Sequence, residues 1–399
     1  MRKIIALFAV VLCLMISENN TAFCAQSHSG VWNVLVIPPS GGWETEPGKS
    51  ISTALKWCEK EIGESSSGVG GHDLHFMTAE VSGDVESFRR LNLNYGRDVV
   101  AVLSFAELPE LDRVLVDRMA GRDVPLLLAG GESVLIDRGG RPLANIFALD
   151  LYRDYRASAF TEYAKTIFGK KKRIALAASR FTVNQEREAK ICYDLLDRAG
   201  FMPMPYWADA SVKDSYYMLS EEIESYEGEE AGVVISFMGS MGAREIWRNF
   251  MRLRTSWRLW NCTMPDKSYL SCRGMVFADQ NVLLASQGGF LETKRMMWRT
   301  RAMPISDTVH AGKAVALCEW VKRAVEMMPQ PVDNIPRGQF LANLGRVKGI
   351  PFGNQVLDIA PDLHRPSARN AYIVQVRDRD YLFVDVVNTR GLAYKEEQL

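Results

Sequence analysis

Short apolar runs alternate with amphipathic helical periods along most of this 399-residue chain. This alternation is typical of α/β proteins, in which helices cover both faces of a parallel sheet. The apolar runs are nearly continuous and rich in β-branched residues, as expected of strands that are buried on both faces. We therefore predict doubly wound α/β lobes with right-handed crossovers. The predicted strands are residues 32–38, 73–81, 98–105, 123–130, 172–179, 231–239 and 274–279.

Helical periods fill the intervals between these strands. Ile51, Leu55, Cys58 and Ile62 recur at spacings of four, three and four, which places them on one face of a helix. Similar faces predict helices over residues 108–121, 155–169, 186–200, 243–253 and 307–329. The end of the chain differs, because short apolar runs at 349–361, 371–378 and 381–387 are separated by turn residues. This pattern predicts a hairpin-rich end.

The first 25 residues have the pattern of a secretory signal peptide. Arg2 and Lys3 precede an apolar run over residues 4–16, and small residues follow at 22–25. The run is shorter than the roughly 20 residues of a membrane-spanning helix. We expect a periplasmic or secreted protein, cleaved after Cys24 or Ala25. Lipid attachment at Cys24 is the alternative, although the bulky Phe23 before it argues against that reading.

Charge and length exclude several classes of protein. Lysine and arginine number 48, and so do aspartate and glutamate, so we expect no nucleic-acid partner. About 375 residues remain after the signal peptide, which is more than one hydrophobic core usually supports, and two lobes are therefore expected. The histidines are scattered and no C-x-x-C pattern occurs, so we predict neither a metal site nor a cofactor.

The seven cysteines point to packing more than to chemistry. Cys58, Cys192 and Cys318 fall on apolar faces of predicted helices, where we interpret them as small buried hydrophobic residues. Cys262 and Cys272 lie close together in the sequence and could close a loop as a disulfide in an oxidising compartment. Both states of that pair remain open at this stage.

Familiar catalytic and nucleotide-binding motifs are not present. The stretch "PPSGGWETEPGKS" contains "GKS" but lacks the first glycine of a P-loop. Ser240 directly follows Gly239, so the G-x-S-x-G spacing of a hydrolase nucleophile is not met. No aspartate stands at a spacing that marks His310 or His364 as part of a triad. We predict no catalytic residue, and a secreted α/β enzyme remains only an alternative.

Loops at the predicted strand ends carry small, aromatic and hydroxyl residues. Glycines allow a ligand to approach backbone donors, serines can bind carboxylate or carbonyl oxygens, and aromatic rings supply apolar walls. Together these loops predict a binding site for a small molecule. Its predicted residues are Trp43, Ser104, Phe105, Gly131, Glu132, Ser133, Phe181 and Met238.

In its order of segments the chain resembles the type I periplasmic binding proteins, in the branch that binds branched-chain amino acids and amides for ABC transporters. The resemblance is carried by residues 34–62, 99–105, 124–133, 169–179 and 353–376. It implies two Rossmann-like lobes joined by three crossovers, near 147–151, 277–281 and 352–356. Lobe one would comprise 26–149 and 279–350, and lobe two 150–278 and 351–399. The resemblance also implies a monomer that closes on a solute and presents it to a membrane permease.

The sequence departs from that family where a ligand carboxylate would be held. The loop after the third predicted strand has Glu107 and Leu108 where amino-acid binders carry serine and threonine, and lobe two has "SRFTVN". Asp266 aligns with the acid that meets the ligand's ammonium group, although a solvated turn aspartate is equally consistent with its position. We expect an amino acid, an amide or a related polar solute. A ligand sensor that signals to a membrane receptor remains the alternative function.

Overall fold

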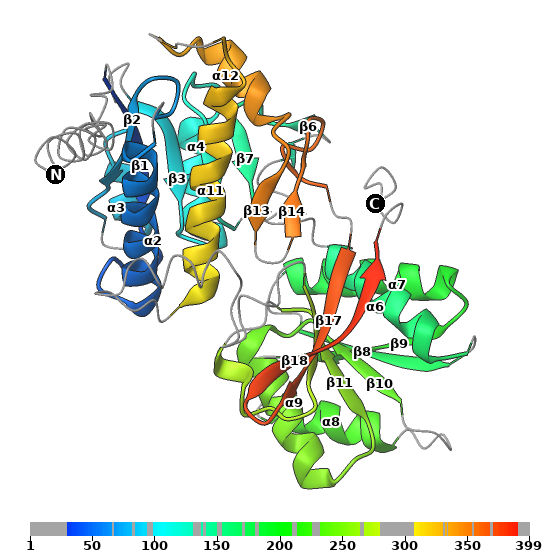
Figure 1. Ribbon diagram of the computed structural model, residues 1–399. Coiled ribbons are helices and arrows are strands. Elements are labelled where there is room, and N and C mark those ends of the chain that lie inside the picture. The colour runs from blue at the N-terminus through cyan, green and yellow to red at the C-terminus, as the bar shows by residue number, and fades with distance from the viewer. Residues whose placement is uncertain are drawn as a thin grey trace, which may run out of the picture.

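The computed structural model describes residues 30–65, 68–81, 84–93, 99–130, 137–138, 141–149, 154–169, 172–179, 183–209, 214–225, 232–263, 267–279, 307–329, 332, 334–352, 355–367 and 370–389. The predicted signal peptide lies outside these residues. The chain forms two α/β lobes (Figure 1). No helix in the described ranges is both long enough and apolar enough to cross a membrane.

Lobe one is built on a parallel sheet in the order β2-β1-β3-β4-β7. On β1, Val34 and Val36 face one core cluster and Leu35 and Ile37 face another, as the two-residue period of a doubly covered strand requires. Helices α2 and α11 pack on the first face, and α3 and α4 on the second. The elements are β1 (Val31–Ile37), α2 (Glu46–Gly63), β2 (Asp73–Thr78), α3 (Val85–Arg90), β3 (Val99–Ser104), α4 (Pro109–Met119), β4 (Leu126–Leu128), β7 (Ile146–Ala148), α11 (Thr308–Glu326) and α12 (Arg337–Leu344).

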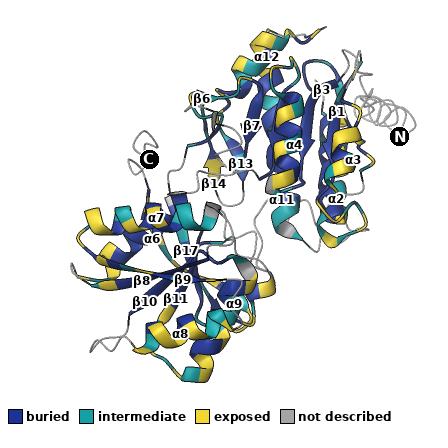
Figure 2. Ribbon diagram, turned by 180° about the vertical axis from the view of Figure 1, so that it is seen from behind, coloured by how far each residue is buried: buried dark blue, intermediate teal, exposed yellow. Residues whose placement is uncertain are grey.

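Three small antiparallel pairs also occur: β5 (Asp137–Arg138) with β6 (Arg141–Pro142), β13 (Ile350–Phe352) with β14 (Gln355–Leu357), and β15 (Ile359–Ala360) with β16 (Arg365–Pro366). The hairpin-rich end predicted from the turn residues is therefore present. Figure 2 shows the result of this packing in both lobes, with buried strands between helices whose outer faces are exposed.

Lobe two has a sheet in the order β18-β17-β12-β11-β10-β8-β9. The strands from β9 to β12 are parallel, and β17 and β18 are antiparallel additions at one edge. Helices α6 and α7 cover one face, and α8 and α9 the other. The elements are α6 (Asp154–Ile167), β8 (Arg173–Ser179), α7 (Val183–Arg198), β9 (Met202–Ala208), α8 (Ser215–Ser225), β10 (Val233–Ser236), α9 (Gly239–Leu253), β11 (Arg258–Asn261), the 3-10 turn η1 (Lys267–Tyr269), β12 (Val276–Asp279), β17 (Asn370–Arg377) and β18 (Asp380–Asn388).

The described elements pass from lobe to lobe three times. The first passage lies between Leu149, which is in the lobe-one core, and α6. The second lies between β12 and Asp307, whose backbone N–H donates to Ser50 Oγ in lobe one. The third corrects the expected position near 352–356. Phe352, Leu357 and Ile359 pack in the lobe-one core, and Ala148 N donates to His364 O at 3.1 Å, so lobe one extends to Ser367 and lobe two resumes at β17.

The disulfide considered between Cys262 and Cys272 is not formed. Cys262 belongs to the core cluster under α6 and α7, whereas Cys272 belongs to the cluster under α8 and α9. The two thiols are free and lie on opposite faces of the lobe-two sheet. Closeness in sequence was misleading, because the chain reaches the other face of the sheet between them.

Candidate functional site

The strand order of lobe one creates a topological switch point between β1 and β3. The chain leaves β1 for α2 on one face of the sheet and leaves β3 for α4 on the other, so the two loops diverge at the carboxyl edge. Ligands of open α/β sheets bind at such a point. Figure 1 shows that α12, which follows α11, lies at the far end of lobe one, so the N-terminal ends of α2 and α11 face lobe two.

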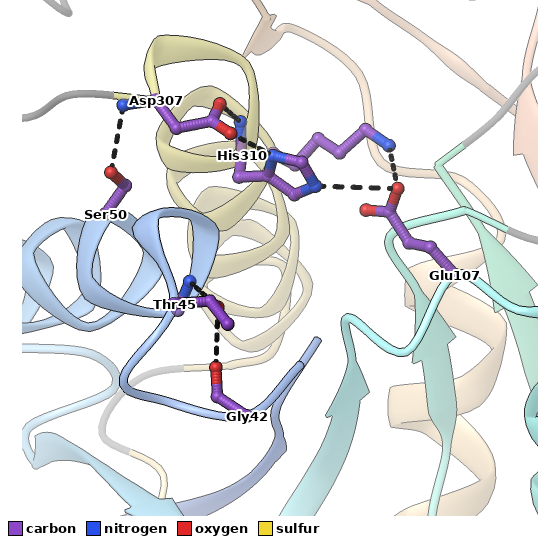
Figure 3. Close-up of polar contacts among 8 residues, drawn as sticks. Gly42, Thr45, Ser50, Glu107, Asp307 and His310 are labelled. Carbon is purple, nitrogen blue, oxygen red and sulfur yellow. Dashed lines mark hydrogen bonds and ion pairs between the residues drawn. The ribbon is translucent and has the colours of Figure 1, made fainter. Parts of the chain in front are cut away.

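The loop after β1 is fixed by local hydrogen bonds. Gly42 has a left-handed φ of 81°, and its N–H donates to Pro39 O at 2.8 Å. Thr45 caps α2, since its hydroxyl accepts from Gly48 N at 3.2 Å and donates to Gly42 O at 2.7 Å (Figure 3). A Cβ on Gly48 would lie 2.4 Å from Gly42 O, so this close approach requires glycine.

Trp43 lies half-buried at the end of the same loop. Its ring packs against the lobe-one core, and Nε1 donates to Ala79 O at 3.3 Å, just beyond β2. The indole is therefore held by the protein itself. Its predicted role as a wall for a ligand stays a prediction.

The last residue of β3 and the first residue of the following loop are fully buried. Ser104 is 1% exposed, and its hydroxyl accepts from Ala106 N at 3.3 Å. The ring of Phe105 is part of the lobe-one core. Both residues are predicted from the sequence to contact a ligand. In the structure both side chains are buried and support the loop from the core.

The side chain that leaves this loop on the exposed side is Glu107. Its backbone is left-handed, with φ of 55°, which is uncommon for a residue other than glycine and occurs often at functional loops. Lys313 Nζ of α11 donates to Glu107 Oε2 at 2.9 Å, and His310 Nε2 lies 3.8 Å from the same oxygen. Lys313 is 3% exposed, whereas Glu107 is 22% exposed.

Asp307, the residue before α11, completes this arrangement. Its Oδ1 accepts from His310 N at 3.1 Å as the helix cap, and its Oδ2 accepts from His310 Nδ1 at 2.7 Å. Figure 3 shows the imidazole held between Asp307 and Glu107, beside the start of α2. We refer to Glu107, Asp307, His310 and Lys313 as the Glu107 cluster.

Charge in the Glu107 cluster depends on the imidazole. With a neutral ring, two carboxylates face one ammonium group, and the cluster carries one net negative charge. A protonated ring brings the sum to zero and directs an N–H at each carboxylate. With a neutral ring the cluster can therefore accept hydrogen bonds from a donor on a ligand, and it disfavours a ligand carboxylate at the same place.

Asp307, His310 and Lys313 are not among the site residues predicted from the sequence. Asp307 stands three residues before His310, a spacing that does not by itself mark a triad. The relevant signal is the capping pattern: an aspartate before a helix reaches the residue three positions on. Glu107 is distinguished in the sequence only by its departure from the family pattern.

In lobe two, the corresponding loops follow the ends of β10 and β11. Ser236 is fully buried and its hydroxyl accepts from Met238 N at 3.4 Å. Met238 itself is buried in the core beside α8 and α9, and α9 begins after it without a side-chain cap. At the end of β11, Asn261 Nδ2 donates to Thr263 Oγ1 at 2.8 Å.

The remaining predicted site residues lie outside the described part of the chain: Gly131, Glu132, Ser133, Phe181 and Asp266. Among the described residues, no group of three or more histidine, cysteine, aspartate or glutamate side chains is arranged to hold a metal ion.

A cavity of about 690 Å³ opens elsewhere on lobe one, between the end of β2 and α3. Acidic side chains and an arginine border it, together with Leu35 and Met77. None of the predicted site residues lines this cavity, although Ala79, which accepts the Trp43 N–H, does. It lies beside the end of β2, the edge strand of the lobe-one sheet.

Neither a family model nor a curated protein matches this sequence. Solved structures do match. An ABC transporter substrate-binding protein from Sphaerobacter thermophilus has a TM-score of 0.70 at 15% identity, over 90% of this chain and 98% of the other. The leucine binding protein LivK from Thermotoga maritima has a TM-score of 0.65 at 11% identity, over 90% and 99%. A solute binding protein from Rhodopseudomonas palustris, in complex with 3,4-dihydroxybenzoic acid, has a TM-score of 0.64 at 15% identity, over 90% and 98%.

The chain has the fold of these substrate-binding proteins. The predicted fold of two doubly wound α/β lobes is confirmed. The Glu107 cluster lies at the carboxyl end of β3 and the N-terminal end of α11, and these ends of the two elements face lobe two (Figure 1).

Proposed function

We propose that this protein is an extracytoplasmic solute-binding protein, which captures a small polar ligand between its lobes and delivers it to the permease of an ABC importer. One observation carries the proposal: the Glu107 cluster sets partly exposed hydrogen-bonding groups at the switch point of lobe one, on the side toward lobe two. The fold shared with substrate-binding proteins supports it. The proposal includes export, binding without catalysis, and a monomeric state.

The chemistry of the Glu107 cluster narrows the ligand. Glu107 and Asp307 outnumber Lys313 in charge unless His310 is protonated, so the ligand end nearest to them should carry donors, such as an ammonium or amide group. Comparison proteins include a leucine binding protein and benzoate and dihydroxybenzoate complexes. Among these chemistries the cluster favours an amino acid or amide over a simple aromatic acid with its carboxylate at Glu107.

The residues predicted from the sequence complete the proposed site. Trp43, Gly131, Glu132, Ser133, Phe181 and Asp266 would contact the ligand. Ser104, Phe105 and Met238, which are buried, would position the loops that do so. Closure of the lobes would then shield the ligand, because a ligand that touches both lobes favours the closed state.

The ligand is to be identified by native mass spectrometry of gently purified protein, followed by calorimetry with that compound. Glu107→Gln keeps the shape of the side chain and removes its charge, so it should weaken binding of a cationic ligand about 10-fold or more, the scale of a lost charge-assisted bond. Glu44→Gln is the matched control, because Glu44 is 94% exposed on the neighbouring loop and should bind normally.

Small-angle scattering tests the lobe closure. The protein should become more compact when the identified ligand is added. Recovery of a chemically altered compound would instead point to an enzyme, and equal affinities of wild type and Glu107→Gln would remove the Glu107 cluster from the site.

A further inference from the structure

Helices α2 and α11 pack side by side on one face of lobe one, although more than 200 residues separate them in sequence (Figure 1). Their N-terminal ends are joined by the hydrogen bond from Asp307 N to Ser50 Oγ, at 3.0 Å. Both helices run from that end toward α12, so they are parallel. This bond fixes their relative register.

This register places Cys58 of α2 and Cys318 of α11 at similar distances along the paired helices. Cys58 lies eight residues beyond Ser50, and Cys318 eleven beyond Asp307, which precedes its helix. At about 1.5 Å per residue these distances are about 12 and 16 Å from the joined ends. The two side chains are 3% and 1% exposed, and they belong to the same core cluster. The Cys318 thiol hydrogen-bonds with Cys58, which raises the pKa of Cys318 together with its burial.

We infer that Cys58 and Cys318 form a disulfide in the exported protein. The two thiols are free in the structure, and they are already in contact. In the reaction one thiolate attacks the disulfide of an oxidant, such as a protein thiol oxidase or glutathione disulfide, and forms a mixed disulfide. The second thiolate then displaces the oxidant's sulfur. Two electrons and two protons pass to the oxidant, which leaves as two thiols.

Burial determines when this reaction can take place. Thiol exchange needs a thiolate that an oxidant can reach. In the folded lobe both sulfurs are enclosed by the core, so the bond should form before α11 has docked fully on α2. Once formed, it should resist reduction until the lobe unfolds.

The bond would join the two separate segments of lobe one. Lobe one is assembled from two segments, which lie within residues 30–149 and 307–367. These segments can pack together only after most of lobe two, which lies between them in the sequence, has been synthesised. A cross-link that spans 260 residues removes much of the freedom of the unfolded chain. The pair in lobe two with the shorter sequence separation, Cys262 and Cys272, cannot do this from opposite faces of its sheet.

The inferred disulfide rests on the packing of Cys58 against Cys318, whereas only the supply of an oxidant rests on the proposed export. Two experiments therefore test the disulfide and the export separately. First, reduced and denatured protein is refolded in a glutathione redox buffer, alkylated in denaturant and mapped by mass spectrometry without reduction. We expect a linked pair of peptides with Cys58 and Cys318, and alkylated Cys272. Recovery of alkylated Cys58, or of Cys58 bound to another cysteine, overturns the inference.

Second, the same map is made on protein recovered from the export compartment of a bacterial host. Linked peptides support both proposals, whereas linkage only after refolding in glutathione overturns the export while the pairing stands. A thermal readout accompanies the map, because Cys58→Ser can itself disturb the core. Wild type and Cys272→Ser should both melt about 5 to 10 °C lower after unfolding and refolding with a reductant. Cys58→Ser should show no such dependence on reductant.

Discussion

Lys313 Nζ lies 2.9 Å from Glu107 Oε2, which joins the loop after β3 to helix α11 across 206 positions of sequence. The lysine is almost fully buried, whereas the glutamate is partly exposed. A buried ammonium group is costly unless it is paired, so the fold keeps Glu107 in place even though its backbone is left-handed. The same contact holds Glu107 Oε2 at the edge of lobe one where we propose that the ligand binds.

Replacing Lys313 with methionine tests this pairing. Methionine fills a similar volume without charge, so Glu107 would lose its nearest cation at a partly buried site. We expect a loss of about 1 to 3 kcal/mol in the free energy of unfolding, measured with urea. This is below the full cost of breaking a buried pair because the Glu107 side chain is partly exposed.

The double variant Lys313→Met, Glu107→Gln provides the control. Without either charge the penalty for an unpaired carboxylate disappears, and the double variant should be more stable than Lys313→Met alone. Strict additivity of the two single changes would show that the ion pair does not couple them.

Gly48→Ala tests the close contact at the start of α2. The added methyl group would lie 2.4 Å from Gly42 O and 2.7 Å from Trp43 Cα, both of which are backbone atoms that cannot rotate away. We expect a loss of about 2 to 3 kcal/mol on unfolding in urea. Gly338→Ala in α12 is the control, because nothing lies within 4 Å of its added methyl group, and it should be neutral or stabilising by up to about 1 kcal/mol.

Most of the fold follows from sequence periodicity. The alternation of apolar runs and helical faces predicts both doubly wound sheets, and the amphipathic spacing of Ile51, Leu55 and Cys58 matches the buried face of α2. The third passage between the lobes was misplaced because it depends on tertiary packing. The apolar pattern of β13 and β14 would fit a position in either lobe. Their packing against α11 and the lobe-one core places them in lobe one.

The candidate site was harder to predict, for a physical reason. Strand ends identify the loops, but the pattern does not show which side chains turn outward. Ser104 and Phe105 are buried in the core, whereas Glu107, whose backbone is left-handed, is partly exposed. His310 and Lys313 come from a helix far along the chain, so only the register between α2 and α11 brings them to this edge.

Arg254→Gly should stabilise lobe two. Arg254 ends α9 with φ of 55° and ψ of 34°, and its N–H donates to Phe250 O. This conformation costs an L-residue about 1 to 2 kcal/mol. Glycine avoids that cost, but part of the gain is lost because glycine increases the conformational freedom of the unfolded chain. We expect a gain of about 0.5 to 1 kcal/mol in urea unfolding. Met251→Gly is the contrasting variant, since Met251 is 54% exposed inside the same helix and should lose about 1 kcal/mol.

Alkaline pH should destabilise lobe two through Cys192. Its thiol is fully buried on α7, and burial raises its pKa far above the ordinary value of 9.0. The folded pKa thus exceeds the unfolded one, so the unfolded chain loses this proton first, and stability that is complete below about pH 9 falls as pH rises. For one thiol this loss is about 1.4 kcal/mol between pH 8 and pH 10.

Cys192→Ala removes this titration, so its stability deficit relative to wild type should shrink by about 1.4 kcal/mol from pH 8 to pH 10. Urea unfolding in a phosphine reductant at both pH values measures it, and other titrating groups cancel in the comparison. Leu196→Ala on the same helix is the control, because Leu196 is equally buried and does not titrate. Its deficit should be the same at both pH values. A constant deficit for Cys192→Ala as well would mean that the thiol ionises in the folded protein as readily as in the unfolded chain.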